Sequence, residues 1–172
     1  MGKEFGQGNF ASCSIESKMK NEFSSIAELI PHQPPMRLVD EILCVEENEG
    51  QARAYVRPDH LFLRGDGTLA PEAFCELIAQ GFAACEAQRR VWRGETIDGG
   101  GYLANVRDVT VVDYAHVGDT LTIVTSQADD CFGTRIVKGR VQRGTQVLAQ
   151  GTVYIFMWEG TTPSPHKLAT DI

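Results

Sequence analysis

Alternation of apolar and polar residues predicts two strands in the first half of the chain. From Gln51 to Val56, alanine and valine take every second position, and this two-residue period is that of a strand with one buried face. The stretch Met36–Val45 is also strand-like, and the polar run Asn48-Glu49-Gly50 predicts a turn between them. We therefore expect these two strands to form a hairpin.

The second half of the chain, after a polar loop with three consecutive glycines, is almost entirely strand-like. Strands are predicted at Tyr102–Val112, Thr120–Gln127, Phe132–Val141 and Gln146–Met157. Turns are predicted at Val117-Gly118-Asp119, Asp129-Asp130 and Gly144-Thr145. Strands joined by turns this short form an antiparallel meander.

Two segments have helical patterns. Ser24 or Ser25 can cap a short helix over Ile26–Ile30, which three nearby prolines end. The second helix begins at Pro71, a residue that suits the first helical position, and continues to about Trp92. At 1.5 Å per residue it is about 30 Å long. Its length and apolar content predict that it lies in the centre of the fold.

The order of elements predicts an α+β fold: a short helix, a hairpin, a long helix and then four strands. An antiparallel sheet of about six strands needs one face covered, and the long apolar helix can cover it. A sheet wrapped around one central helix is the hot-dog fold. We expect this domain at residues 25–158, with flexible segments at 1–24 and 159–172, which are polar and rich in glycine, proline and threonine.

Composition narrows the possible partners. The chain has 172 residues and a net charge of −7, which argues against sequence-independent nucleic-acid binding. It has no apolar run long enough to span a membrane and no apolar region of a secretory signal after its first charges, so we expect a cytoplasmic protein. The five cysteines include no CxxC pair, and no two histidines have metal-ligand spacing, so neither a metal nor a cofactor is predicted.

Few residues in this sequence suggest chemistry. Glu76 is the only charged residue between Ala73 and Cys85, and a carboxylate among apolar neighbours is a candidate acid or base. The alternative is that Glu72, Glu76 and Gln80 form a plain polar stripe at helical spacing.

The histidines and arginines of the loops are weaker candidates. His32, His60 and His116 lie in loops, where a histidine is usually a surface residue. Arg89, Arg90 and Arg93 complement the helix dipole and could also form a basic patch.

Three motifs in the same order resemble the 3-hydroxyacyl-[acyl carrier protein] dehydratase family. The segment Ile26–Asp40, with its Pro-His, later prolines and final Val-Asp, is similar to the family's N-terminal signature. Glu76-Leu77-Ile78-Ala79-Gln80 is similar to its central-helix motif, and Val117–Leu121 resembles its Pro-Gly-Asp-x-Leu strand opener. The resemblance covers about residues 26–158.

The resemblance implies an elimination of water from a 3-hydroxyacyl thioester. In the family a histidine works with the helix carboxylate of the neighbouring subunit, and Glu76 matches that carboxylate. The family's catalytic histidine loop reads Arg64-Gly65-Asp66-Gly67-Thr68 here, so Asp66 stands where the histidine belongs. The chain therefore resembles a divergent branch lacking that histidine, and Asp66, His60 and His32 are candidates to replace it.

A second departure concerns the thioester oxygen. The family places a glycine N–H at the helix start, whereas this chain has Pro71, which has no N–H. Donors could come instead from Glu72 or Ala73. The resemblance also implies an acyl tunnel, with Phe74 and Ile78 on one wall and residues Tyr102, Leu103 and Val106 opposite. Arg64 is the favoured contact for an acidic carrier protein.

The leading hypothesis is a dehydratase of 3-hydroxyacyl groups carried on acyl carrier protein or coenzyme A, in fatty-acid-like or aryl-polyene-like biosynthesis. The alternatives are an acyl thioesterase on the same fold, which would need only Glu76, and a non-catalytic partner subunit of a dehydratase. An unpaired sheet edge also predicts a homodimer or a dimer of dimers.

Overall fold

The structure is a computed structural model that describes residues 22–158 and 160. A short helix, α2 (Ile26–Leu29), precedes the hairpin β1 (Glu41–Val45) and β2 (Glu49–Tyr55). The long helix α3 (Glu72–Trp92) follows, and then come β3 (Gly100–Val111), β4 (Thr120–Cys131), β5 (Thr134–Arg143) and β6 (Gln146–Trp158). This order confirms the predicted α+β class. The expected flexible segments lie outside the described residues, apart from 22–24 and 160.

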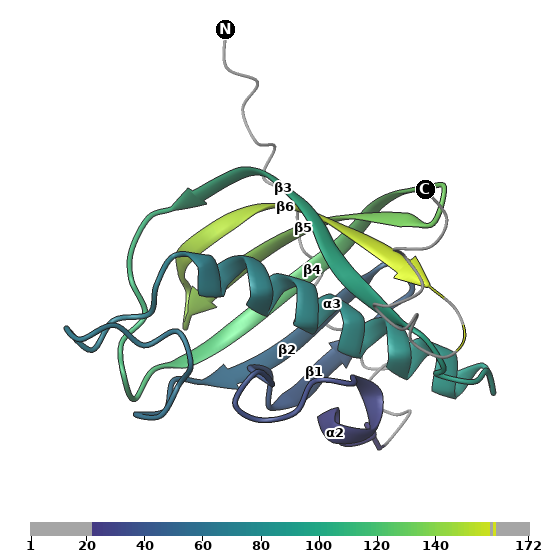
Figure 1. The fold of residues 1–172 in the computed structure, drawn as a ribbon, viewed down its shortest axis with the longest axis horizontal. Helices are drawn as coiled ribbons and strands as arrows, with labels where there is room; N and C mark the ends of the chain where they lie inside the picture. Colours follow the sequence, from purple (N-terminus) through teal and green to yellow (C-terminus); the bar gives the residue numbers. More distant parts are fainter. Residues whose placement is uncertain (1–21, 159, 161–172) are drawn as a thin grey trace, which may run out of the picture.

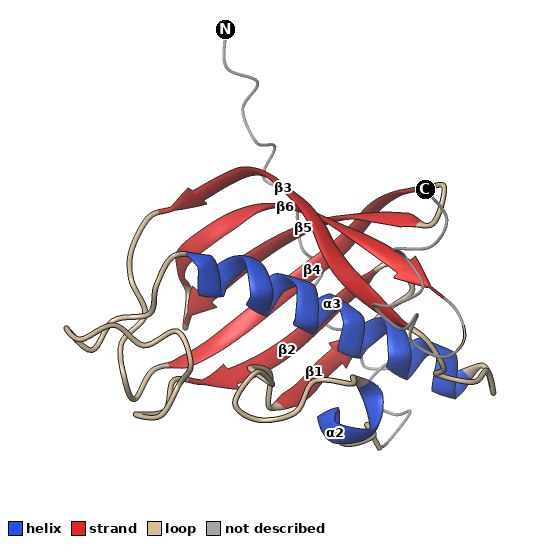
Figure 2. Cartoon of the chain, viewed as in Figure 1, coloured by secondary structure: helices blue, strands red, loops and turns tan. Residues whose placement is uncertain are grey.

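The six strands form one antiparallel sheet in the order β1-β2-β4-β5-β6-β3. The sheet curls around α3, which crosses its concave face (Figures 1 and 2). Strands β1 and β3 are the two edges of this sheet. The predicted hairpin, meander and central helix are therefore all confirmed, and the fold is the hot-dog fold.

Helix α3 is buried along the face that meets the sheet. Phe74, Leu77, Ile78 and Phe82 are almost fully buried, as expected for the apolar stripe of a central helix. Strand β5 approaches the helix closely at Gly139, where an added Cβ would lie 2.3 Å from Cγ2 of Ile78. The buried apolar face of α3 and the close approach at Gly139 therefore determine which side of the helix packs against the sheet.

Several predicted boundaries differ from the structure. β2 begins at Glu49, so Glu49 and Gly50, expected in a turn, belong to the strand. The strand expected at Met36–Val45 is regular only over β1, because residues 37–40 form an extended segment without regular secondary structure. The turn expected at Asp129-Asp130 is wrong, since β4 continues to Cys131. The chain instead turns at Phe132 and Gly133, which have φ angles of 49° and 78°. Asp130 forms an ion pair with Arg135 across the hairpin, so its charge is satisfied within the strands.

No helix among the described residues is long and apolar enough to cross a membrane. No group of three potential ligand side chains that could hold a metal ion occurs in residues 22–158.

Candidate functional site

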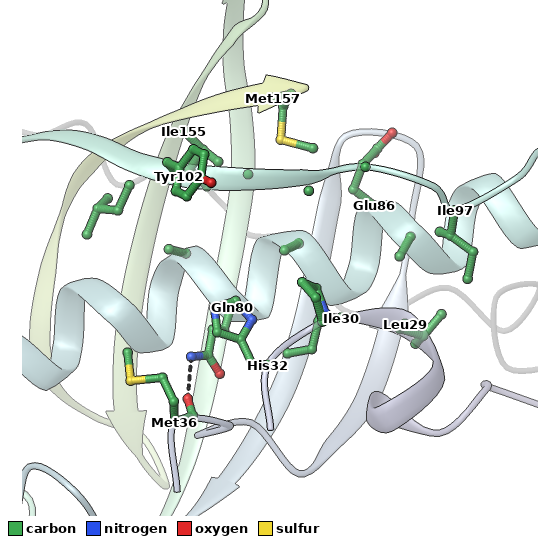
Figure 3. A pocket seen from close by; sticks show the side chains of 18 of the residues that line it. Leu29, Ile30, His32, Met36, Gln80, Glu86, Ile97, Tyr102, Ile155 and Met157 are labelled. Carbon is green, nitrogen blue, oxygen red and sulfur yellow. Dashed lines mark hydrogen bonds between the residues drawn. The ribbon is translucent and has the colours of Figure 1, made fainter. Parts of the chain in front are cut away.

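A cavity of about 440 Å³ lies between α3, the loop that follows α2, and the first residues of β3. Its helix side carries alanines at three successive turns, Ala79, Ala83 and Ala87, and its strand side begins with the glycines at 99–101. These residues leave space because they have small side chains or none. Figure 3 shows Tyr102, Ile155 and Met157 on the sheet side of the cavity, opposite His32 and Gln80.

The structure brings His32 and Glu76 together at this cavity. Nε2 of His32 lies 3.6 Å from Oε1 of Glu76, and their side chains are 27% and 17% exposed. Both residues line the cavity. At this separation a histidine and a carboxylate form an ion pair when the imidazole is protonated. The distance between the two side chains can shorten to that of a hydrogen bond when a substrate binds. Nδ1 of His32 is buried and has no hydrogen-bond partner among the described residues.

Helix α3 and the proline-rich loop are connected by Gln80, which is 1% exposed. Its Nε2 donates to the carbonyl of Met36 and to Oε1 of Glu76, both at 2.8 Å, and its Oε1 accepts from the N–H of Leu38 at 2.8 Å. Figure 3 shows the contact with Met36. After the prolines, the backbone groups of Met36 and Leu38 are therefore hydrogen-bonded to a helix side chain. In a regular strand, a neighbouring strand would supply these partners.

His60 lies in a different part of the surface. It lines a second cavity, of about 480 Å³, with Pro34, Arg37, Tyr55 and Arg57 among its other lining residues. Its Nδ1 accepts a hydrogen bond from the N–H of Phe62 at 3.2 Å, and burial lowers the pKa of its imidazole. The structure does not bring His60 to the cavity of Glu76.

Asp66 is exposed, and its carboxylate is hydrogen-bonded within its own loop. Its Oδ1 accepts from the N–H of Thr68 at 3.0 Å and from the hydroxyl of Thr68 at 2.6 Å. These hydrogen bonds, the side-chain one most of all, hold the pKa of the Asp66 carboxyl below its usual value. Asp66 does not line the cavity of Glu76. It closes a local turn, as aspartate commonly does in such loops.

The structure differs from the expected acyl tunnel at Phe74 and Ile78. Both side chains are fully buried on the sheet-facing side of α3, and neither lines the cavity. They face the core because helical spacing places them on the opposite side from Ala79 and Ala83. On the strand opposite, Tyr102 and Leu103 line the cavity, whereas Val106, also expected there, does not.

The expected oxyanion donors also differ. The N–H of Ala73 donates to the carbonyl of Ala70 at 3.0 Å, and Ala73 is fully buried, so this donor is already in use. Glu72 is exposed in the first turn of α3, and its N–H has the position of a first-turn donor.

The arginines at the end of α3 are not a free basic patch. Arg89 is 7% exposed and donates to the carbonyls of Glu46 and Glu49, both at 2.6 Å. Arg93 pairs with Glu95 at 2.6 Å. Arg64, by contrast, is exposed and lies over the ring of Tyr114, 5.8 Å from its centroid.

The cysteines of α3 are poor nucleophiles. Burial raises the pKa of the Cys75 thiol, and it raises that of Cys85 to about 12. Neither thiol lines the cavity, whereas Glu76 and His32 both do.

Sequence reasoning missed the position of Gln80. Its spacing with Glu72 and Glu76 allowed a plain polar stripe as the alternative interpretation, whereas it is almost fully buried. The signal that could have found it is the segment Met36–Leu38, which directly follows two prolines and lies before the part of the predicted strand that pairs regularly, β1. Backbone groups in such a segment need side-chain partners when they are buried.

Comparison with known proteins identifies a family for the chain. Residues 24–164 match the family model described as ApeP-like, "ApeP dehydratase". No curated protein matches the chain.

Solved structures share the fold. "The Dehydratase Heterocomplex ApeI:P from Xenorhabdus doucetiae" has a TM-score of 0.74 and 22% identity, covering 86% of this chain and 96% of that one. A hypothetical thioesterase protein with coenzyme A from Streptococcus pneumoniae TIGR4 has a TM-score of 0.53 and 12% identity, covering 71% and 88%. The E. coli PaaI protein, from the phenylacetic acid degradation operon, has a TM-score of 0.52 and 12% identity, covering 67% and 81%.

The family match spans most of the chain and includes every element that forms the cavity, and on this ground the chain belongs to the ApeP-like dehydratase family.

Proposed function

We propose that this protein dehydrates 3-hydroxyacyl thioesters carried on acyl carrier protein, in fatty-acid-like or aryl-polyene-like biosynthesis in the cytoplasm. A coenzyme A thioester is the other possible carrier. The observation that carries the proposal is the pair His32 and Glu76, which lie 3.6 Å apart and both line the cavity. Family membership supports the reaction class.

The elimination needs one group that accepts a proton and one that gives a proton. In the proposal, His32 takes the proton from the carbon next to the thioester carbonyl, and Glu76 gives its proton to the leaving hydroxyl on the next carbon. The products are the enoyl thioester and water. Each turnover leaves a proton on His32 and removes one from Glu76, and transfer across the 3.6 Å between them restores both groups.

The thioester oxygen becomes more negative as the proton leaves. A donor at the start of a helix stabilises such a charge. Pro71 has no N–H and Ala73 uses its own within the first turn, so Glu72 is the donor that we assign to this oxygen.

Product analysis tests the reaction. The purified chain is incubated with a 3-hydroxyacyl thioester and, separately, with a saturated acyl thioester, each on carrier protein and on coenzyme A. The proposal predicts an enoyl thioester from the first substrate and no hydrolysis of the second. Hydrolysis of the saturated thioester without enoyl formation identifies a thioesterase, in which Glu76 activates water.

A non-catalytic partner subunit is the second candidate function. It is favoured by the segment 64–68, where Asp66 stands in place of the family's histidine and is hydrogen-bonded to Thr68. The similar structure described as a dehydratase heterocomplex gives this alternative weight. It predicts that the chain alone is inactive and that adding a histidine-containing hot-dog dehydratase gives activity above that of the added subunit alone.

The proposed assembly is a homodimer, or a dimer of dimers, joined along β3. This strand is an edge of the sheet, and its side chains Tyr102, Leu103 and Val106 are 53%, 36% and 38% exposed. Such an edge is usually paired or covered. A second copy paired there would also cover the cavity, because Tyr102 and Leu103 line it. Val106→Lys places a charge on this strand and should yield monomers in light scattering, whereas Lys138→Ala on β5 should not.

A further inference from the structure

The chemistry of the cavity lining changes along α3. His32 and Glu76 line one part of it, and the lining continues along the helix as far as Arg90. Figure 3 shows Glu86 and Ile97 further along α3 than His32. From Glu76 to Arg90 the helix rises about 21 Å, at about 1.5 Å per residue. The cavity therefore has a distal part, around Glu86, Ile97 and Arg90, far from the two groups assigned to the reaction.

The helix surface that leads to the distal part is apolar. Alanines at three successive turns of α3, at 79, 83 and 87, line the cavity between Glu76 and Arg90, and Ile155 and Met157 of β6 also line it. These side chains offer no hydrogen bonds, so they suit a hydrocarbon chain. They suit a phosphopantetheine arm less well, because its amides need hydrogen-bond partners when they are buried. The acyl chain, and not the arm, is therefore the part of a thioester that fits this direction.

The two carboxylates of the distal part already have partners. Oε2 of Glu86 lies 3.0 Å from Nη1 of Arg89, and its Oε1 lies 3.5 Å from Nη2 of Arg93. A hydrogen bond from the side chain of Thr96 holds the pKa of the Asp98 carboxyl below its usual value. Both carboxylates line the cavity, but their charges are balanced or bonded by neighbouring residues.

Arg90 differs from these carboxylates because most of its donors are unused. Its Nε lies 3.5 Å from Oε2 of Glu95, and its side chain is 23% exposed. Among the described residues, its two terminal amino groups have no hydrogen-bond or ion-pair partner. The chemical group that fits them is an oxygen that accepts a hydrogen bond. Because Glu86 and Asp98 disfavour a second negative charge nearby, a neutral oxygen fits better than a carboxylate or a phosphate.

We propose that Arg90 is a specificity-determining residue that binds a neutral oxygen, such as a hydroxyl, at the distal end of the substrate's acyl chain. The proposal rests on the proposed function, because it names the class of acyl chain that the same cavity accepts. A chain of about 16 carbons spans the rise from Glu76 to Arg90 at about 1.3 Å per carbon. Since helix side chains lean toward the N-terminus, Arg90 can also meet a chain of about 10 carbons.

Binding of stable analogues tests the proposal without turnover. The probes are acyl analogues of N-acetylcysteamine thioesters in which an amide replaces the thioester, so that they carry no phosphate and cannot be hydrolysed. Chains of about 10 to 16 carbons end in a methyl, a hydroxyl or a carboxylate. By isothermal titration calorimetry, the hydroxyl should bind about 10-fold more tightly than the methyl at the best chain length. The carboxylate should bind no more tightly than the methyl.

Arg90→Gln should remove this preference and leave the affinity for the methyl-ended chain within about twofold. The matched control is Arg53→Gln on β2, which also removes an arginine paired with a glutamate, Glu41, but does not line the cavity. It should keep the preference for the hydroxyl. If Arg90 only pairs with Glu95 and complements the helix dipole, Arg90→Gln will lower the midpoint temperature of unfolding and leave the preference unchanged, and the proposal is overturned.

Two further outcomes overturn the role of Arg90. One is the absence of any preference for the hydroxyl in the unchanged chain. The other is a preference for coenzyme A over its phosphate-free analogue that Arg90→Gln abolishes, which would assign Arg90 to a phosphate. If Arg90→Gln does not fold, Arg90→Met keeps an apolar stem of similar reach and should lose the preference in the same way.

Enoyl formation separates a failure of this proposal from a failure of the proposed function. If no 3-hydroxyacyl thioester is dehydrated but the hydroxyl-ended analogue binds through Arg90, only the proposed function fails. If dehydration occurs with equal kcat/KM for methyl-ended and hydroxyl-ended substrates, in the unchanged chain and in Arg90→Gln alike, only the role of Arg90 fails.

Discussion

Two loops lead toward the central helix, and the sequence offered a candidate histidine or carboxylate in each. The loop at 31–38 carries His32, and its backbone is bonded to Gln80 of α3 at Met36 and Leu38. The loop at 60–69 carries His60 and Asp66, but its hydrogen bonds are largely internal: Phe62 to His60, and Thr68 to Asp66. Only the first loop brings a titratable group to Glu76.

The comparison indicates that a loop brings a titratable side chain to this cavity when its backbone is hydrogen-bonded to α3. A position that matches the family's histidine loop is not sufficient. The second loop is where a family histidine is expected, but its aspartate is used to close a turn. The first loop reaches the cavity because Gln80 supplies the hydrogen bonds that a strand partner would supply. In the proposed mechanism, His32 of the neighbouring loop replaces the family's histidine, while Glu76 keeps its place on the helix.

The largest effect is expected at Glu76, which both functional hypotheses for an enzyme require. Glu76→Gln keeps the shape of the side chain and removes its ionisable group, so the rate of enoyl formation should fall about 10²- to 10⁴-fold. Circular dichroism and light scattering should remain as in the unchanged chain. The control is Glu47→Gln, an exposed carboxylate in the β1–β2 turn. A rate within threefold of the unchanged chain would return Glu76 to a plain polar stripe.

A smaller effect is expected at Arg64, the residue of the second loop for which we propose a role in docking and not in chemistry. Arg64 is exposed and has no ion-pair partner among the described residues, so it can attract an acidic carrier protein. Arg64→Glu should raise KM several-fold for carrier-protein substrates, and less so at high salt. Small N-acetylcysteamine thioesters should be turned over at nearly the original rate. An equal loss on both substrates would mean that Arg64 supports the site itself.

The smallest effect is expected at Asp66, on stability alone. Its hydrogen bonds to Thr68 lower the pKa of the carboxyl in the folded state, so the stabilisation is present above the unfolded value of about 3.8 and is lost as the pH falls through the folded value. Asp66→Ala should therefore lower the midpoint temperature slightly at pH 7 and not at strongly acid pH. A difference that grows on acidification would contradict this sign.

The fold was largely predictable from the sequence because its strongest signals are local. The long run without proline after Pro71 gives α3, and short turns join β4, β5 and β6. The misplaced turn at Asp129-Asp130 shows the weakness of composition alone. Aspartates mark turns in many sequences, but here Asp130 pairs with Arg135 across the hairpin, and Phe132-Gly133 make the turn.

The site was less predictable because it depends on contacts between distant parts of the chain. Glu76 was identifiable as a single charge in an apolar stretch, and His32 was one of three candidates of equal standing. Only the structure separates them, since His32 and Glu76 are far apart in sequence and 3.6 Å apart in space. Phe74 and Ile78 were assigned to the tunnel because apolar character does not reveal which side of a helix faces a cavity and which faces the sheet.

The most direct test of the pair His32 and Glu76 compares two histidine variants side by side. His32→Asn and His60→Asn make the same chemical change in the two loops, and His116→Asn, an exposed histidine near the β3–β4 turn, controls for the change itself. Measured by enoyl formation, the first should lose about 100-fold or more, while the other two stay within threefold. A full rate in His32→Asn, or a comparable loss in His60→Asn, would contradict the assignment of the reactive pair.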